Sequence, residues 1–258
     1  MKTIKDKFNL DGKVAIITGS SNGIGKAIAK AFAECGATVI ISSRKQEACD
    51  KVVDEFKAAG LKAVAIACHV GEAAGRTTLV EKTIATCGGI DILVNNAATN
   101  PIYGAIEDGA EDAFDKIMNI NVKAPWDLAN KCLPSMKSRK GGSIINISSI
   151  EGEKPGFGLG LYSTSKAAIS MLTKNQAKEW GKHGIRVNAI CPGLIQTKFS
   201  SALWNDEKII GHINKNLPLG RMGQPDEMAS VALMLASDSG SYVTGSLIVA
   251  DGGFLISE

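Results

Sequence analysis

The sequence has little of what marks membrane, secreted or nucleic-acid-binding proteins. No uninterrupted apolar run approaches the ~18 residues that a membrane-spanning helix needs. The first residues, MKTIKDK, carry charges with no apolar segment behind them, unlike a secretory signal peptide. The formal net charge is only +3 and the cations are scattered along the chain, so we expect no nucleic acid and no membrane as partner.

Paired cysteines and metal-ligand clusters are missing as well. The six cysteines include no Cys-x-x-Cys pair, and a chain of 258 residues can bury a core without disulfides. We therefore expect reduced thiols and a cytoplasmic location. No group of His, Cys and carboxylate residues has the spacing of metal ligands, so no metal site is predicted.

What the sequence does have is a regular alternation of short apolar runs with longer amphipathic stretches. The apolar runs are rich in β-branched residues, which suits strands buried on both faces of a parallel sheet. They cover residues 14–17, 38–41, 63–67, 92–94, 143–147, 185–190 and 247–249. Helical patterns lie between them, for instance at 24–35, 46–59 and 161–180. The alternation predicts an α/β single-domain Rossmann fold, a doubly wound seven-stranded parallel sheet with helices on both faces.

The predicted domain spans residues 1–258, because no linker, repeat or low-complexity segment interrupts the pattern. Its cofactor-binding half would cover about 11–150, and its catalytic and substrate-binding half about 149–258. The least regular stretch, about 194–223, follows the sixth predicted strand and carries scattered apolar residues. An insertion beyond the carboxyl end of a strand forms either a lid over the substrate or a surface helical hairpin that only packs.

Three glycines, Gly19, Gly23 and Gly25, follow the first predicted strand and lead into a helix. Glycine permits a tight turn and close approach of the backbone to a pyrophosphate, and a helix N-terminus offers free N–H groups and a positive dipole end. The spacing is G-x-x-x-G-x-G rather than G-x-G-x-x-G. Its position between a strand and a helix predicts a dinucleotide phosphate site.

The choice of dinucleotide should depend on Ser43, Arg44 and Lys45, at the end of the second predicted strand. An acidic residue there would bind a ribose diol and repel a 2′-phosphate. Hydroxyls and cations instead suit a phosphate dianion, so we predict NADP(H), preferred over NAD(H). The alternative is an ordinary solvated helix start, although cations are unfavourable at that end of a helix.

Tyr162 and Lys166 are one helical turn apart in Tyr-Ser-Thr-Ser-Lys, which puts both side chains on one face of a helix. A free phenol, with a pKa near ~10, is a poor base at neutral pH, and a nearby ammonium lowers that pKa. In reduction, the phenol donates its proton to the developing alkoxide. Ser149, after the fifth predicted strand, would hydrogen-bond the carbonyl oxygen. These residues predict hydride chemistry on a carbonyl or alcohol.

In this order, the motifs resemble those of the classical short-chain dehydrogenase/reductase family over essentially the whole chain. Thr18 to Gly25 is similar to the family's cofactor loop, and Cys191 to Gly193 to its nicotinamide-contacting segment. The resemblance implies a catalytic tetrad of Asn121, Ser149, Tyr162 and Lys166. The cofactor-binding residues that it implies are Gly19, Ser21, Asn22, Gly23, Ile24, Gly25, Ser43, Arg44, Lys45, His69, Val70, Asn96, Ala97, Tyr162, Lys166, Pro192, Gly193, Ile195 and Thr197.

Within the family, the chain looks most similar to the NADPH-dependent carbonyl/retinol reductases, which implies a homotetramer. The segments that carry this narrower resemblance are Ser43 to Lys45, His69 to Gly71, Asn96 to Pro101 and Leu203-Trp204. Two positions depart from the family: His69 replaces an aspartate that contacts adenine, and Ala98 replaces a glycine. The last residues are not a Ser-Lys-Leu-type tripeptide, so peroxisomal import is not expected.

Three further polar residues compete for roles in the site. Asn119, two residues before Asn121, is an alternative for the proton relay, and either amide could instead cap a helix. His183 fits a helix C-terminus, which favours cations. His212 falls in the 194–223 stretch and would touch substrate only if that stretch is a lid.

The predicted function is hydride transfer between NADP(H) and a carbonyl or alcohol, most simply the reduction of a lipophilic ketone or aldehyde. Phe157, Leu159 and Leu161 just before Tyr162 favour a small apolar substrate, unless they fill core or subunit contacts. One alternative is a 3-oxoacyl thioester reductase or a hydroxysteroid dehydrogenase. Another is a non-catalytic NADP(H)-sensing module, which would be expected to lack the tyrosine or the lysine.

Overall fold

The computed structural model describes the whole chain except residues 1–2, 202–210, 212–214, 216 and 258. Its centre is a seven-stranded parallel sheet with the order β3-β2-β1-β4-β5-β6-β7, which confirms the predicted fold class. The strands are β1 (Val14–Thr18), β2 (Thr38–Ser42), β3 (Ala63–Ala65), β4 (Ile92–Asn95), β5 (Gly142–Ile147), β6 (Ile185–Pro192) and β7 (Leu247–Ala250).

All seven predicted runs contain a strand, and the main difference is at β3. The run was expected to continue to Ala67, but β3 ends at Ala65. Hydrogen bonds towards the β2 side continue past Ala65, from the Ile66 N–H to the Ile41 carbonyl at 3.0 Å and from the Cys68 N–H to the Ser43 carbonyl at 2.9 Å. The Ala67 N–H between them donates to the side chain of Gln46 at 3.0 Å. A local side-chain contact of this kind leaves no mark on the apolar pattern.

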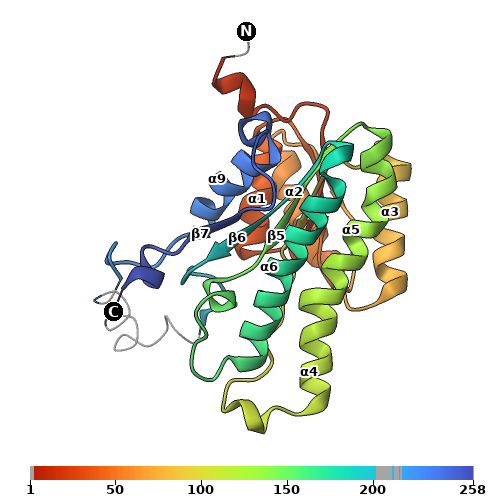
Figure 1. The fold of residues 1–258 in the computed structure, drawn as a ribbon. Helices are drawn as coiled ribbons and strands as arrows, with labels where there is room; N and C mark the ends of the chain where they lie inside the picture. Colours follow the sequence, from red (N-terminus) through yellow and green to blue (C-terminus); the bar gives the residue numbers. More distant parts are fainter. Residues whose placement is uncertain (1–2, 202–210, 212–214, 216, 258) are drawn as a thin grey trace.

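Helices cover both faces of the sheet (Figure 1). On one face lie α1, α2 and α9, and on the other α3, α5 and α6. The helices are α1 (Gly23–Glu34), α2 (Gln46–Ala58), α3 (Ala73–Cys87), α4 (Glu111–Met118), α5 (Ala124–Ser138), α6 (Gly160–Trp180) and α9 (Pro225–Ala236). Short turns of 3-10 helix are η1 (Lys5–Phe8), η2 (Ile106–Asp108), η4 (Ile150–Gly152), η5 (Gly181–His183), η6 (Asp238–Gly240) and η7 (Phe254–Ile256), and η3 (Asn119–Lys123) is a turn of π-helix.

The central strands are largely apolar because their side chains pack into two cores. Along β1, Ala15 and Ile17 belong to the cluster under α1 and α9, whereas Val14 and Ile16 belong to the cluster under α3 and α5. Successive side chains of a strand point to opposite faces, so a sheet covered on both sides needs an unbroken apolar run. None of the helices in the described part of the chain combines the length and apolar character needed to cross a membrane.

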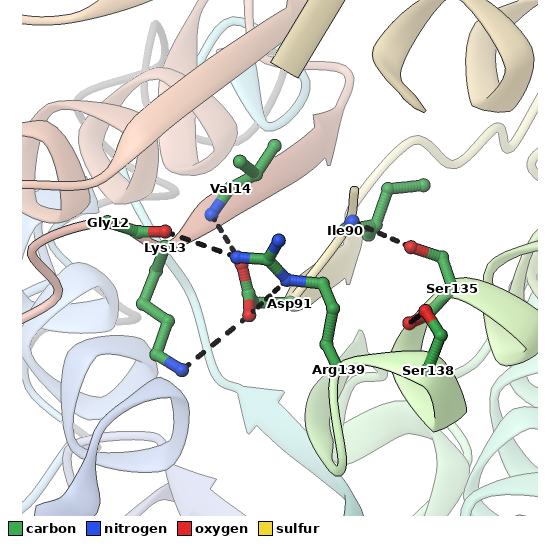
Figure 2. Close-up of polar contacts among 8 residues, drawn as sticks. All are labelled: Gly12, Lys13, Val14, Ile90, Asp91, Ser135, Ser138 and Arg139. Atoms are coloured by element: carbon green, nitrogen blue, oxygen red, sulfur yellow. Dashed lines mark hydrogen bonds and ion pairs between the residues drawn. The ribbon is translucent and has the colours of Figure 1, made fainter. Parts of the chain in front are cut away.

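At the amino end of the sheet, a buried carboxylate joins β1, β4 and the end of α5 (Figure 2). Asp91, which is 4% exposed, accepts hydrogen bonds from the Val14 N–H at 2.9 Å and from Arg139 Nε at 2.8 Å. Lys13 Nζ lies 3.6 Å from the same carboxylate. The buried Asp91 carboxylate therefore has a partner for its charge and for its hydrogen bonds. These contacts hold together the end of the sheet that lies away from the candidate site.

The carboxyl ends of the strands form the opposite edge. From β1 the chain runs outward to β2 and β3, then returns to β4 and proceeds through β5, β6 and β7. The order thus reverses between β1 and β4, and open α/β sheets bind ligands outside the carboxyl ends of the strands at such a point. The glycine loop follows β1, Asn96 follows β4, and Ser149 follows β5.

Candidate active site

The loop between β1 and α1 is held by the side chain of Asn96. Gly19 has a φ of +68°, a left-handed conformation that favours glycine. A Cβ on Gly25 would lie 2.5 Å from Asn96 Nδ2 and 2.6 Å from the Gly19 carbonyl oxygen. Asn96 Nδ2 itself donates to the carbonyl oxygens of Thr18 at 2.8 Å and Gly19 at 3.2 Å. Asn96, predicted to bind the cofactor, thus uses its amide nitrogen to shape the loop.

The first turn of α1 offers backbone N–H groups to an anion. Asn22 occupies the cap position, yet its side chain makes no capping hydrogen bond and instead contacts Ser21 Oγ at 3.5 Å. The N–H groups at a helix start, together with the helix dipole, make an anion site. Thr197 approaches this turn, since its Cγ2 would lie 3.4 Å from a Cβ on Gly23. A pyrophosphate fits this cradle, which a side chain at Gly25 would obstruct.

Ser43, Arg44 and Lys45 lie between β2 and α2, beside the glycine loop. Ser42, the residue before them, donates its N–H to Ser20 Oγ at 2.9 Å, which ties this strand end to the loop. Arg44 and Lys45 are exposed, and Lys45 is the cap residue of α2. Two cations thus stand at the positive end of a helix, an arrangement that a bound phosphate would relieve.

The next strand end contributes His69 and Val70. His69 is half-buried, and its Nδ1 accepts a hydrogen bond from the Gly71 N–H at 3.1 Å. Val70 packs in the core, and its carbonyl oxygen accepts from the buried Arg76 at 2.6 Å. This turn is therefore fixed by its own hydrogen bonds, and His69 borders a groove of about 950 Å³ formed mainly by α3, α4, η3 and α5.

Among the remaining predicted cofactor residues, Ala97 and Gly193 are positioned by hydrogen bonds of their backbone N–H groups. Ala97 donates its N–H to Thr18 Oγ1 at 3.0 Å, and Gly193 donates to the Ala250 carbonyl at 3.0 Å just after β6 ends at Pro192. Ile24 and Ile195 pack with the core beneath α1 and α9. Because the side chains of Ile24 and Ile195 face the core, these two residues can offer a ligand mainly their backbone atoms.

Tyr162 and Lys166 lie on the first turns of α6, on one face of the helix as predicted. The Lys166 ammonium is 5.4 Å from the centre of the Tyr162 ring and donates to the Ile147 carbonyl at 2.8 Å. Lys166 is only 3% exposed and makes no ion pair with any carboxylate in the described residues. Burial lowers the pKa of Lys166 to about 8, because the charged form loses its hydration.

The phenol of Tyr162 is also buried, and its pKa departs from the ordinary value. Burial raises the pKa of Tyr162 well above its ordinary value, the charge of Glu151 raises it further, and a hydrogen bond with Ser149 lowers it. The predicted lowering of this pKa by the Lys166 ammonium stays a prediction. In the structure, burial outweighs the hydrogen bond with Ser149. A protonated phenol is a proton donor, not a base.

Ser149 lies directly after β5 and caps η4. Its Oγ accepts a hydrogen bond from the Glu151 N–H at 3.1 Å, so the serine proton remains available for an oxygen acceptor in the site. The side chain is 9% exposed, at the boundary between core and cleft. Phe199 lies on the other side of Tyr162, with ring centres 6.3 Å apart.

Asn121 lies in η3, the π-helical turn between α4 and α5, and is 2% exposed. Its Oδ1 accepts from the Thr99 N–H at 2.9 Å, and its Nδ2 donates to the Thr99 carbonyl and to Ser165 Oγ, each at 3.0 Å. Ser165 precedes Lys166, so Asn121 reaches the candidate catalytic helix. Asn119 instead donates to the Gly71 carbonyl at 3.0 Å, away from that helix. Single π turns occur often at functional sites.

The remaining residues that the sequence suggested for the site lie away from Tyr162 or outside the described residues. His183 lies in η5, at the far end of α6 from Tyr162. Leu203, Trp204 and His212 lie outside the described residues. In the described part of the chain, no group of His, Cys, Asp and Glu side chains could hold a metal ion.

Two residues with roles in this geometry were not identified from the sequence. Thr18 Oγ1 accepts the N–H groups of Asn96 and Ala97, each at 3.0 Å, and so joins β1 to the end of β4. A threonine directly before the glycine loop was a usable signal. Glu151 contacts the segments of both Ser149 and Tyr162, and only its position two residues after Ser149 pointed to it.

Comparison with known proteins decides the family. A family model described as "Enoyl-(Acyl carrier protein) reductase" matches residues 19–255. A rabbit (Oryctolagus cuniculus) protein named dehydrogenase/reductase SDR family member 4 is 46% identical over 244 residues, covering 95% of this chain and 94% of that protein. This chain belongs to the short-chain dehydrogenase/reductase family. The human mitochondrial family member 2 is 40% identical over 249 residues, with 96% and 89% of the two chains covered.

Solved structures of short-chain dehydrogenases agree with the fold. A gluconate 5-dehydrogenase from Burkholderia cenocepacia, in complex with NADP and tartrate, is 33% identical with a TM-score of 0.95 and covers 99% of this chain and 100% of its own. A 7α-hydroxysteroid dehydrogenase in complex with NADH and 7-oxo glycochenodeoxycholic acid is 35% identical with a TM-score of 0.93 and covers 98% of each chain. The chain is therefore a dehydrogenase/reductase that acts on alcohol and carbonyl groups with a nicotinamide cofactor.

Proposed function

We propose that the protein reduces lipophilic ketones or aldehydes with NADPH. The observation that carries the proposal is the buried, protonated phenol of Tyr162, hydrogen-bonded to Ser149 and next to the ammonium of Lys166. A phenol whose pKa is raised by burial holds its proton until an alkoxide develops beside it. A protonated phenol in this position suits the proton-donating step of a carbonyl reduction.

The site residues divide the work as follows. When bound, the reduced nicotinamide would supply the hydride, with its pyrophosphate on the start of α1. Ser149 orients the carbonyl by donating its hydroxyl proton to the substrate oxygen. Tyr162 then transfers the phenolic proton to the same oxygen. Lys166 and Asn121 support the return of a proton to Tyr162, with Lys166 also binding the ribose of the cofactor.

An apolar substrate is supported by the surroundings of Tyr162. Phe199 stacks at an angle against it, and exposed Phe157 (89%) and Tyr103 (74%) flank the same end of the sheet. The Tyr103 ring packs against Gly158, since a Cβ added to this glycine would lie 3.0 Å from the ring. Exposed aromatic side chains around a reactive group favour a lipophilic ligand.

The cofactor-binding half of the domain is proposed at about 11–150 and the catalytic half at about 149–258.

NADP(H) is proposed as the preferred cofactor because Arg44 and Lys45 are exposed at the end of β2.

A homotetramer is supported by exposed apolar side chains on two separate faces. Phe114, Trp126 and Met171 lie on α4, α5 and α6, whereas Tyr242, Val249 and Ile256 lie around β7. The reduced cysteines support a cytoplasmic location.

Hydroxysteroid dehydrogenase is the second candidate, favoured by the likeness to the bile-acid enzyme bound to NADH. The test is to measure initial rates with NADPH and NADH against simple ketones, aldehydes, steroids and acyl thioesters. We expect NADPH-dependent turnover of one lipophilic carbonyl class. Turnover of a steroid with NADH alone would favour the second candidate, and turnover of acyl thioesters alone would favour a thioester reductase.

The tyrosine variant tests the mechanism on the same substrates. Tyr162→Phe should lower kcat/KM by roughly 10²- to 10⁴-fold, the usual contribution of general acid catalysis, with NADPH affinity within a few-fold of the wild type. Tyr242→Phe, at a fully exposed tyrosine, is the matched control and should retain full activity. Full activity in Tyr162→Phe would exclude the proposed proton donor. Cofactor binding without turnover of any substrate by the wild type would instead support a sensing role.

A further inference from the structure

We propose that Glu151 is a positioning residue that joins the Ser149 turn to the Tyr162 helix and helps to keep the Tyr162 phenol in its proton-donating form. The inference rests on the proposed function, because it concerns the same site. Glu151 is not one of the residues that the sequence motifs singled out. It lies in η4, half-buried, two residues after Ser149.

Glu151 contacts three points around the site. Its carboxylate Oε2 accepts hydrogen bonds from the Gly156 N–H at 2.6 Å and from Ser163 Oγ at 3.0 Å. Its own backbone N–H donates to Ser149 Oγ at 3.1 Å. Ser163 is the neighbour of Tyr162 on α6. One residue therefore connects the end of β5, the following loop and the start of α6.

The loop needs this connection because its backbone is unusually free. Four glycines, at positions 152, 156, 158 and 160, lie between Ser149 and Tyr162. Glycine loses more conformational freedom on ordering than any other residue. Without an anchor, the distance between the two hydroxyls would vary with the loop. A shift of about 1 Å in such a pair lowers catalytic rates roughly 10²-fold.

The charge of Glu151 has a second effect. The groups around Tyr162 are Ser149 and Glu151, which act on its phenol, and the Lys166 ammonium over its ring. The Cys191 thiol on β6 interacts with Lys166. Lys154, on the loop, is directed to the Phe254 ring, 5.9 Å away. A carboxylate beside the phenol opposes loss of the phenolic proton. Tyr162 is thus held in the form that donates a proton to a substrate oxygen.

Glu151→Gln separates the two effects, since the amide oxygen can still accept from Gly156 and Ser163 but the charge is gone. Removing the charge should lower the apparent pKa that limits alcohol oxidation by about 0.5 to 1. Below that pKa, the kcat of alcohol oxidation should rise about 3- to 10-fold over the wild type, and the pH profiles of both directions should move to lower pH. Glu179→Gln, at an exposed carboxylate near the far end of α6 from Tyr162, is the matched control and should leave both profiles unchanged.

Ser163→Ala tests the connection without changing the charge. It removes one donor to the carboxylate, so kcat should fall several-fold in both directions while the pH profiles keep their positions. If Glu151→Gln fails to fold, as seen by circular dichroism, this variant alone decides the positioning role. Wild-type kcat in Ser163→Ala, or wild-type pH profiles in folded Glu151→Gln, would overturn the proposal for Glu151. A wild-type enzyme inactive on every carbonyl and alcohol would instead overturn the proposed function.

Discussion

The two ends of the sheet bury opposite charges and treat them differently. At the amino end, the Asp91 carboxylate is 4% exposed and meets Arg139, Lys13 and the Val14 N–H. At the carboxyl end, the Lys166 ammonium is 3% exposed and meets one carbonyl oxygen. The two charged groups are thus equally buried, but Asp91 has cationic partners and Lys166 has no carboxylate partner in the described residues.

The difference separates stability from chemistry. A paired buried charge strengthens the fold only as long as both partners remain. An unpaired buried lysine destabilises the fold, but its pKa moves towards neutrality, where proton transfer is useful. The amino end therefore holds the strands together, and the carboxyl end keeps a group that the folded chain would be more stable without. Substitutions at the two ends should have opposite effects on stability.

Asp91→Ala should give the largest change in stability. It leaves Arg139 without its buried partner and the Val14 N–H without an acceptor, which together should lower the free energy of unfolding by about 4 kcal/mol. Urea unfolding measures this loss, and kcat per folded molecule should be unchanged. Asp112→Ala, at an exposed aspartate on α4, is the control and should change stability by less than about 0.5 kcal/mol. A loss of kcat with normal stability would contradict the division between the ends.

Lys166→Met should have the opposite sign. The pKa of Lys166 falls from 10.5 to about 8 on folding, so the charged lysine destabilises the fold by about 3 kcal/mol at pH 7. Between pH 8 and 10.5 the unfolded chain holds more protons than the folded chain, so wild-type stability rises through this window. The variant should thus be more stable at pH 7, by an amount that shrinks towards pH 10.

Urea unfolding without cofactor at several pH values tests this prediction. Lys178→Met, at an exposed position on the same helix, should show no such pH dependence. A Lys166→Met protein less stable than the wild type at pH 7 would mean that the hydrogen bond to Ile147 matters more than the buried charge.

Arg44→Ala should give the smallest effect, confined to the cofactor. Losing one exposed charge-assisted contact should raise KM for NADPH about tenfold, or about 1.4 kcal/mol, and leave KM for NADH nearly unchanged. Lys51→Ala, an exposed cation further along α2, is the control. Equal changes with both cofactors would mean that Arg44 is merely solvated.

The sequence predicted the fold well because it follows from local periodicity. The unbroken apolar runs require a sheet covered on both faces, and Tyr162 and Lys166 share a helix face by spacing alone. Effects that depend on the surrounding three-dimensional environment were missed. The pKa of Tyr162 depends on burial by segments far apart in the sequence, and the Ala67 N–H finds its partner in the side chain of Gln46 on α2. No periodicity encodes either.

The π-helical turn at Asn119–Lys123 has a consequence for how the chain can change length. In an α-helix each residue advances the rotation by about 100°. Deleting one residue from this turn would restore regular α-helix, but would rotate Asn121 away from Thr99 and Ser165 and swing α4 around the helix axis. Exposed loops away from the candidate site can gain or lose residues with little effect, whereas this turn fixes the spacing on both sides of it. Insertions and deletions among relatives should therefore avoid residues 119–123 and collect in the connections before α4.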